Sequence, residues 1–202
     1  MRKVIAYRLS VFYNITIANT LRKENVLMTE CCKPLVAVMM GSKNDLPVLK
    51  SAFQTFEQFG VPYTARVMSA HRTPDAAADF AVNAESAGIK VIICAAGMAA
   101  HLGGVVAAHS TLPVIGLPVA SEPFNGLDAL LATVQMPPGI PVAAVTAGKA
   151  GGKNAALYAI AILALSCPDL SRKLKEFRKE QTAQVIKADE ELQQELKAGL
   201  IS

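Results

Sequence analysis

Residues 34–45 read PLVAVMMGSKND, a short apolar run that ends in a glycine and a group of small polar residues. An uninterrupted apolar run of this length is typical of a strand buried in a parallel sheet. Similar runs, each followed by a helical pattern, occur further along the chain at residues 63–68, 89–97, 112–119 and 141–148. Alternation of strands and helices predicts a parallel sheet with helices on both faces. We therefore expect an α/β domain built from five strand–helix units.

The helical patterns between these runs complete the expected order of elements. They span residues 46–59, 74–87, a stretch that ends near residue 108, then 127–135 and 155–166. The last of these helices is apolar nearly all round, which predicts burial between its own sheet and another subunit. From residue 168 the sequence is charged and amphipathic, which predicts a helix or a pair of helices packed on a neighbouring subunit. We expect the α/β domain at residues 34–167 and a C-terminal helical extension at residues 168–202.

Residues 1–33 form an N-terminal extension that stands apart from this pattern. Residues 1–28 carry five basic side chains and one acidic side chain. Their net charge of +4 equals the formal net charge of the whole chain. Polar residues interrupt the stretch too often for the apolar core of a signal peptide. We expect either a misassigned start, with translation beginning at Met28, or a dispensable and disordered arm.

The composition excludes several classes of function. The chain after residue 28 is neutral, so we expect no binding to nucleic acid. The hydrophobic fraction is 52% and the mean hydropathy is +0.34, yet no apolar run reaches the roughly eighteen residues that span a membrane. The apolar excess instead predicts contacts between subunits. Four cysteines without a CxxC pair fit a reducing cytoplasm.

Small and polar residues gather where the first three expected strands end. In open parallel sheets, ligands bind at the carboxyl ends of the strands, where the strand order reverses. If the strands take the common order 2-1-3-4-5, the loops after the first three strands lie side by side. The candidate binding residues in these loops are Gly41, Ser42, Asn44, Asp45, Ser69, Ala70, His71, Arg72, Gly97, Ala99, His101 and Leu102.

The chemistry of these residues suits a phosphorylated sugar. Glycine lets the backbone approach a ligand closely, helix N-termini offer N–H groups, and the guanidinium of Arg72 matches phosphate. His71 and His101 are candidates for proton transfer, because imidazole exchanges protons near neutral pH. A purely structural role is the alternative for single residues, since Asp45 and Thr73 are each suited to cap the helix that follows. We place His109, near the end of a helix, outside the site.

Other kinds of site find no support. Residues 148–155 read GKAGGKNA, which lacks the four-residue gap of a phosphate loop and has Asn154 where Ser or Thr would hold magnesium. No GxGxxG motif follows a strand, so we expect no dinucleotide cofactor. No group of carboxylates, histidines or cysteines has the spacing of metal ligands. The sequence therefore predicts neither a cofactor nor a metal.

Several blocks of the sequence carry a resemblance to a known family. They are VMMGSKNDLPV at 38–48, SAHRTPD at 69–75, AAHLGGVVAA at 99–108, VQMPPGIPV at 134–142 and GKAGGKNAAL at 148–157. In this order they resemble the N5-carboxyaminoimidazole ribonucleotide mutases, class I enzymes of the phosphoribosylaminoimidazole carboxylase catalytic subunit family. The resemblance covers about residues 34–183. It implies a three-layer, flavodoxin-like α/β fold, a cytoplasmic homo-octamer and no cofactor.

The resemblance also implies a reaction and a set of roles. The implied reaction is a step of purine biosynthesis that converts N5-carboxyaminoimidazole ribonucleotide to 4-carboxy-5-aminoimidazole ribonucleotide, with carbon dioxide trapped between two half-reactions. By position, His71 is the general acid and base. Ser42, Asp45, Ser69 and Arg72 fall on the positions that hold ribose and phosphate. The loop that carries His101 closes over the base.

The chain departs from the family pattern at three positions. Met98 stands where the family usually has glycine, Gly103 where it has proline, and Asn44 where a second serine is common. We expect Met98 to crowd the base and Gly103 to make its loop more mobile.

Two alternative functions remain open at this point. One is a direct aminoimidazole ribonucleotide carboxylase of the same fold, which typically has His-Lys in place of His71-Arg72. The other is a non-catalytic flavodoxin-like module, either a phosphorylated receiver or a flavin carrier. The receiver is disfavoured because the third expected strand ends in Gly97 rather than aspartate.

Overall fold

The computed structural model of this protein describes residues 33–200, so the expectation for the N-terminal extension at residues 1–33 falls, apart from Lys33, outside the described residues. Five parallel strands form one sheet: β1 (Val36–Met40), β2 (Tyr63–Val67), β3 (Val91–Gly97), β4 (Val114–Val119) and β5 (Ala143–Ala144). Their order is β2-β1-β3-β4-β5, the common order on which the expected grouping of the loops depended. Because all strands run in the same direction, the loops that follow them lie along one edge of the sheet.

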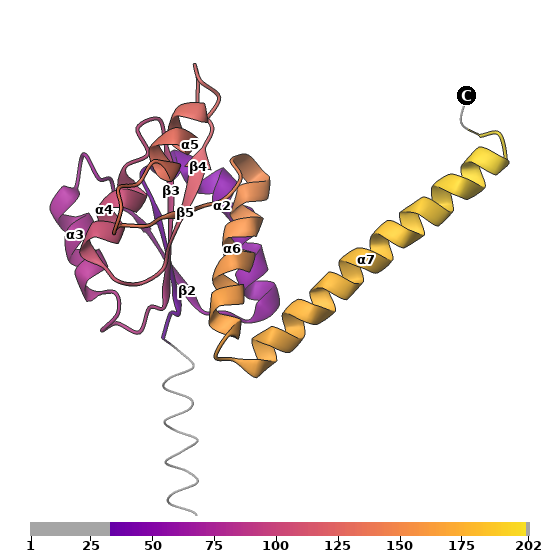
Figure 1. Cartoon of the computed structure of the whole chain (residues 1–202), viewed down its shortest axis with the longest axis horizontal. Coiled ribbons are helices and arrows are strands. Elements are labelled where there is room, and N and C mark those ends of the chain that lie inside the picture. The colour runs from indigo at the N-terminus through magenta and orange to yellow at the C-terminus, as the bar shows by residue number, and fades with distance from the viewer. Residues whose placement is uncertain (1–32, 201–202) are drawn as a thin grey trace, which may run out of the picture.

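Helices cover both faces of this sheet. Alternate residues of a strand point to opposite faces, and Val36 and Val38 pack with α2 (Leu46–Phe59) and α6 (Gly148–Ala164). On the other face, Ala37 and Met39 pack with α3 (Pro74–Asn83) and α4 (Leu102–His109), while α5 (Leu127–Val134) packs on β4. Figure 1 shows α2 and α6 on one side of the sheet and α3 and α4 on the other. The predicted three-layer, flavodoxin-like architecture is confirmed.

Two helices between the strands show how local sequence sets their ends. α2 has the predicted bounds, with Pro47 in its first turn and Gly60 after its end at φ 70°, a left-handed conformation that favours glycine. α3 ends at Asn83, earlier than the expected residue 87, and the chain then turns to Gly88 at φ 99°.

The beginning of α6 differs from the expectation. The sequence predicted a helix from residue 155 after a strand at 141–148, but β5 holds only Ala143 and Ala144, and α6 begins at Gly148. Glycine is a poor helix former, but here the packing requires it. A Cβ on Gly152 would lie 2.2 Å from the carbonyl oxygen of Val48 in α2. Gly152 therefore lets the start of α6 lie directly on α2.

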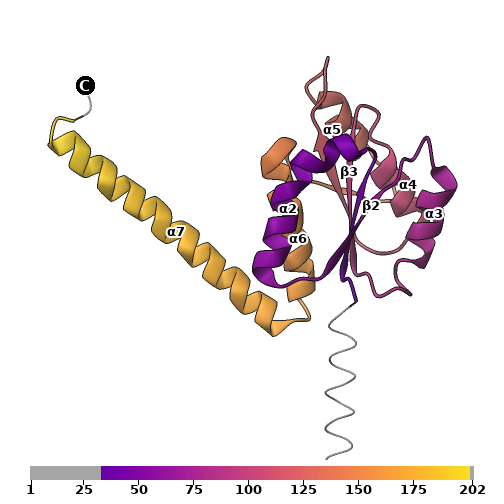
Figure 2. The same cartoon turned by 180° about the vertical axis from the view of Figure 1, so that it is seen from behind.

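The C-terminal extension is a single helix, α7 (Pro168–Lys197), rather than a pair. Leu170 is buried, and Leu174 and Phe177 pack against the core, so the first turns of α7 are attached to the domain. Figures 1 and 2 show the rest of α7 projecting away from the sheet and its helices. Further along it, Val185, Ile186, Leu192 and Leu196 are exposed. Within residues 33–200, no helix combines the length and the apolar character that crossing a membrane requires.

Candidate active site

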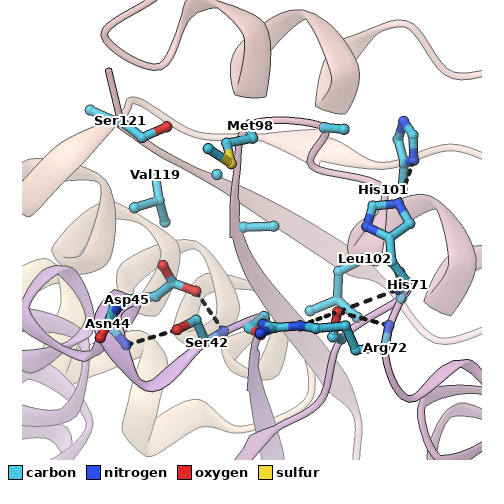
Figure 3. A pocket seen from close by; sticks show the side chains of 17 residues that line it. Ser42, Asn44, Asp45, His71, Arg72, Met98, His101, Leu102, Val119 and Ser121 are labelled. Atoms are coloured by element: carbon cyan, nitrogen blue, oxygen red, sulfur yellow. Dashed lines mark hydrogen bonds between the residues drawn. The ribbon is translucent and has the colours of Figure 1, made fainter. Parts of the chain in front are cut away.

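The loops at the carboxyl edge of the sheet line an open cavity of about 600 Å³. Every residue predicted for the site lines this cavity, from the loops after β1, β2 and β3. Figure 3 shows their side chains converging on it. Five lining residues were not in the predicted set: Ala96, Met98, Val119, Ala120 and Ser121.

The loop after β1 is held by a reciprocal pair of hydrogen bonds. The backbone N–H of Ser42 donates to Oδ2 of Asp45 at 2.9 Å, and the N–H of Asn44 donates to Oγ of Ser42 at 3.1 Å. The expectation that Asp45 caps α2 with its side chain is wrong, because the carboxylate turns back to Ser42. Asp45 is largely buried, and burial raises its pKa, although the hydrogen bond from Ser42 and the charge of Arg72 act in the opposite direction.

Ser69 and Thr73 fix the loop after β2. Oγ of Ser69 accepts the backbone N–H of His71 at 3.3 Å and that of Arg72 at 3.2 Å. Oγ1 of Thr73 accepts the N–H of Ser69 and donates to its carbonyl oxygen, so Thr73 closes the loop instead of capping α3 with its side chain. Residues 69–73 thus form one hydrogen-bonded turn that presents His71 and Arg72 to the cavity.

Arg72 joins the first two loops. Its Nη2 donates to the carbonyl oxygen of Gly41 at 2.7 Å. This hydrogen bond connects the loop after β2 to the loop after β1. A guanidinium has five N–H donors, so this contact leaves others for an anion in the cavity.

His71 and His101 face each other at one end of the cavity. Nε2 of His71 lies 2.9 Å from Nδ1 of His101, and the rings meet edge to face with centroids 5.0 Å apart. The sequence placed both histidines in neighbouring loops but did not predict this contact. His109 lies outside the cavity, where its Nδ1 is 2.8 Å from the carbonyl oxygen of Val105.

Met98 occupies an unfavourable backbone conformation at the edge of the cavity. Its φ is 55°, in the left-handed region that favours glycine. Its side chain is 62% exposed. The side chain stands over the cavity in Figure 3, so a residue without a side chain at this position would leave the cavity wider.

The loop after β4 supplies the residues that sequence reasoning missed. Val119 ends β4, and Ala120 and Ser121 follow it into the cavity. The predicted strand order was the available signal, because it places the end of β4 beside the end of β3. No polar cluster marks this loop in the sequence, and a single serine does not stand out.

The site has donors for an oxygen-rich ligand and groups for proton transfer. Ser42, Ser69 and Arg72 can donate to phosphate or ribose oxygens, and the two imidazoles can exchange a proton. Among residues 33–200, no group of three or more histidine, cysteine, aspartate or glutamate side chains is placed to hold a metal ion.

Comparison with known proteins agrees with this geometry. The family model described as AIR carboxylase matches residues 35–184. A curated N5-carboxyaminoimidazole ribonucleotide mutase from Pyrococcus horikoshii is 52% identical over 153 residues, which are 76% of this chain and 85% of that protein. The mutase of the same name from Bacillus subtilis is 51% identical over 154 residues, 76% of this chain and 94% of that protein.

A solved structure extends the comparison to three dimensions. The crystal structure of Treponema denticola PurE superposes with a TM-score of 0.72 at 29% identity, covering 79% of this chain and 98% of that one. Sequence, fold and cavity thus agree, and the chain belongs to the AIR carboxylase family.

Proposed function

We propose that this protein is an N5-carboxyaminoimidazole ribonucleotide mutase of purine biosynthesis. The observation that carries the proposal is His71, which stands in a 600 Å³ cavity beside Arg72 and the Ser42–Asp45 turn. Curated relatives about half identical to this chain bear the mutase name. The residue pair His71-Arg72 favours the mutase, because the direct carboxylases typically have His-Lys there.

In this proposal the loops after β1 and β2 bind the ribose phosphate. Ser42, Ser69 and Arg72 donate to the phosphate, and the backbone N–H groups at the start of α2 and α3 add favourable dipoles. The carboxylate of Asp45 accepts from a ribose hydroxyl. Gly41, Asn44, Ala70 and Gly97 let the ligand approach the backbone, while Ala99, His101 and Leu102 close over the base.

His71 carries both proton transfers. In the first step the bond between N5 and its carboxylate breaks, carbon dioxide leaves, and His71 delivers a proton to the nitrogen. In the second step C4 attacks the carbon dioxide, and the same imidazole removes the proton from C4. The carboxylate has then moved from nitrogen to carbon, and His71 is restored to its starting protonation state.

Carbon dioxide must stay in the site between these steps. Apolar residues, among them Ala96, Leu102 and Val119, also line the cavity. An apolar wall offers no hydrogen bonds to water and so helps to exclude it. A lining of small side chains also lets carbon dioxide remain next to the base.

The proposal includes a cytoplasmic homo-octamer in which α7 packs on a neighbouring protomer. The apolar residues Val185, Leu192 and Leu196 are exposed along the projecting part of α7. Leu127, Leu131 and Val134 on α5, with Tyr158 and Leu165 on or next to α6, are also exposed. Apolar surface of this extent supports contacts between subunits.

A direct aminoimidazole ribonucleotide carboxylase is the second candidate, since the matching family model carries the description AIR carboxylase. The two reactions differ in the source of the carboxylate. We would supply unlabelled N5-carboxyaminoimidazole ribonucleotide in buffer with ¹³C-bicarbonate, and in parallel aminoimidazole ribonucleotide in the same buffer. The mutase should form unlabelled product from the first substrate and little from the second. Fast formation of labelled product from the second would instead identify a carboxylase.

A flavodoxin-like binding module without catalysis is a third possibility, and the same assay excludes it if product forms. If neither substrate reacts, the visible absorbance of the purified protein would reveal a bound flavin. An inactive protein that carries flavin would contradict the mutase proposal.

A further inference from the structure

The hydroxyl of Ser121 is a buried polar group without a partner. Its Oγ has essentially no exposed surface, and it forms no hydrogen bond within residues 33–200. Buried hydroxyls are nearly always hydrogen-bonded, because losing contact with water without replacement is unfavourable. The other atom of this kind, Oδ1 of Asp128, belongs to a residue outside the cavity, whereas Ser121 lines it.

The surrounding chain holds this hydroxyl in the wall of the cavity. Ser121 follows β4 by two residues, in a loop that folds back so closely that a Cβ on Gly126 would lie 2.9 Å from Cα of Ala120. Opposite Ser121 stands Gly97, where an added Cβ would lie 3.6 Å from Oγ of Ser121. In the view of Figure 3 the oxygen of Ser121 is directed toward Met98, with the two histidines on the far side. The hydroxyl is thus held on the side of the cavity opposite His71.

We infer that Ser121 is a further substrate-binding residue, whose hydroxyl forms a hydrogen bond to the bound ribonucleotide from the side opposite His71. This inference rests on the proposed function, since it takes the ribonucleotide as the ligand. Unlike Ser42 and Ser69, Ser121 has no hydrogen bond to maintain within the described part of the free protein. Its hydroxyl therefore contributes to ligand binding and not to the stability of the fold.

A residue that only binds ligand and a residue that only stabilises the fold respond differently to substitution, and this distinguishes the two roles of Ser121. Ser121→Ala removes one hydroxyl and leaves no partner unsatisfied in the free protein, so the melting temperature should stay the same or rise. Binding of the carbon-carboxylated product, measured by calorimetry, should weaken by about three- to tenfold, the effect of one neutral hydrogen bond. Ribose 5-phosphate as a second ligand shows whether the sugar phosphate or the carboxylated base receives the bond.

Ser110 provides a matched control. Its Oγ accepts the backbone N–H of Leu112 at 3.3 Å, near the opposite edge of the sheet. Ser110→Ala should lower the melting temperature slightly and leave product binding unchanged, the reverse of the pattern expected for Ser121→Ala.

The possible outcomes separate this inference from the proposed function. Weaker product binding by Ser121→Ala with unchanged or higher stability supports the inference. Equal binding by wild type and Ser121→Ala overturns the inference and leaves the mutase proposal intact. If the wild type binds neither the product nor ribose 5-phosphate, both are overturned. A loss of binding that accompanies a clearly lower melting temperature would assign Ser121 a structural role instead.

Discussion

Nε2 of His71 and Nδ1 of His101 lie 2.9 Å apart, so the two imidazoles at the edge of the cavity share one hydrogen bond. The bond made by one ring nitrogen of a histidine determines which nitrogen carries the proton. His101, which directly precedes α4 at the end of the loop after β3, is therefore in a position to orient the ring of His71 and select its tautomer.

Substitution of His101 tests this arrangement. His101→Asn keeps a polar atom near the position of Nδ1, whereas His101→Leu removes it. We expect kcat to fall by about tenfold to a hundredfold in His101→Leu and by clearly less in His101→Asn, because losing the orientation of an acid/base group should cost less than the roughly 10²- to 10⁴-fold that the group itself contributes. The ¹⁵N shifts of the His71 ring should change in the leucine variant. Equal losses of kcat in both variants, with unchanged shifts, would contradict an orienting role.

Met98 is expected to be strained. A left-handed conformation costs a residue with a side chain about 1–2 kcal/mol, and part of this is offset by the greater freedom of glycine in the unfolded chain. Met98→Gly should therefore raise the free energy of unfolding by about 0.5–1 kcal/mol, as measured by urea denaturation. Met98→Ala is the control, since it shortens the side chain but keeps the unfavourable φ. An equal increase in the free energy of unfolding of Met98→Ala would show that the left-handed backbone conformation is not the cause of the effect.

Gly152 is expected to be required by the contact between α6 and α2. A Cβ there would lie 2.2 Å from the carbonyl oxygen of Val48 and 2.7 Å from Oγ of Ser51, so the helices would have to separate. We expect Gly152→Ala to lower the free energy of unfolding by about 2 kcal/mol or more. Gly103 is the matched control, because its Cβ would meet only Val142 at 3.4 Å and Cys94 at 3.8 Å. Gly103→Ala should leave the free energy of unfolding unchanged or raise it. A similar decrease in the free energy of unfolding for both variants would contradict a specific role of the contact between α6 and α2.

Asp45 should make folding depend on pH in a specific direction. Burial raises the pKa of its carboxyl, although the N–H of Ser42 and the charge of Arg72 counteract this. The folded protein therefore binds this proton at a higher pH than the unfolded chain does. Ionised Asp45 destabilises the fold at neutral pH, and the penalty disappears as pH falls through the raised pKa toward the ordinary value of 3.8.

Asp45→Asn removes this charge and keeps an oxygen that can accept from Ser42. The variant should be at least as stable as wild type at about pH 7, and its advantage should shrink toward about pH 4. Urea denaturation across this range measures the difference. An advantage that grows as the pH falls would show that the carboxylate is stabilised in the folded protein instead.

The strands and three loops of the site could be predicted because they depend on local pattern. Short apolar runs ending in glycine and polar residues mark buried parallel strands. The strand order does not follow from local pattern; it was assumed as the common order 2-1-3-4-5, and only with that assumption do His71 and Arg72 lie beside Gly41. The start of α6 could not be predicted, because Gly152 disfavours a helix locally and is required there by contact with Val48. Asp45 does stand at the N-cap position of α2, but the sequence could not show that its carboxylate accepts from Ser42 instead of from the first turn of α2.

Two features of the site depend on side-chain placement that no sequence pattern reveals. The contact between His71 and His101 requires particular rotamers on two different loops. Ser121 differs from other loop serines only in being buried without a partner, which is a property of the folded chain. Both features concern the chemistry of the site, and neither changes the predicted fold.

In the proposed mechanism, His71 transfers the protons in a carboxylate shift from nitrogen to carbon. The most direct test of this role is the conversion of freshly prepared N5-carboxyaminoimidazole ribonucleotide by wild type and by His71→Asn, followed through formation of the carbon-carboxylated product. We predict rapid conversion by the wild type and a loss of about 10²- to 10⁴-fold in the variant, with product binding and melting temperature preserved. Undiminished conversion by a folded His71→Asn protein would contradict the account.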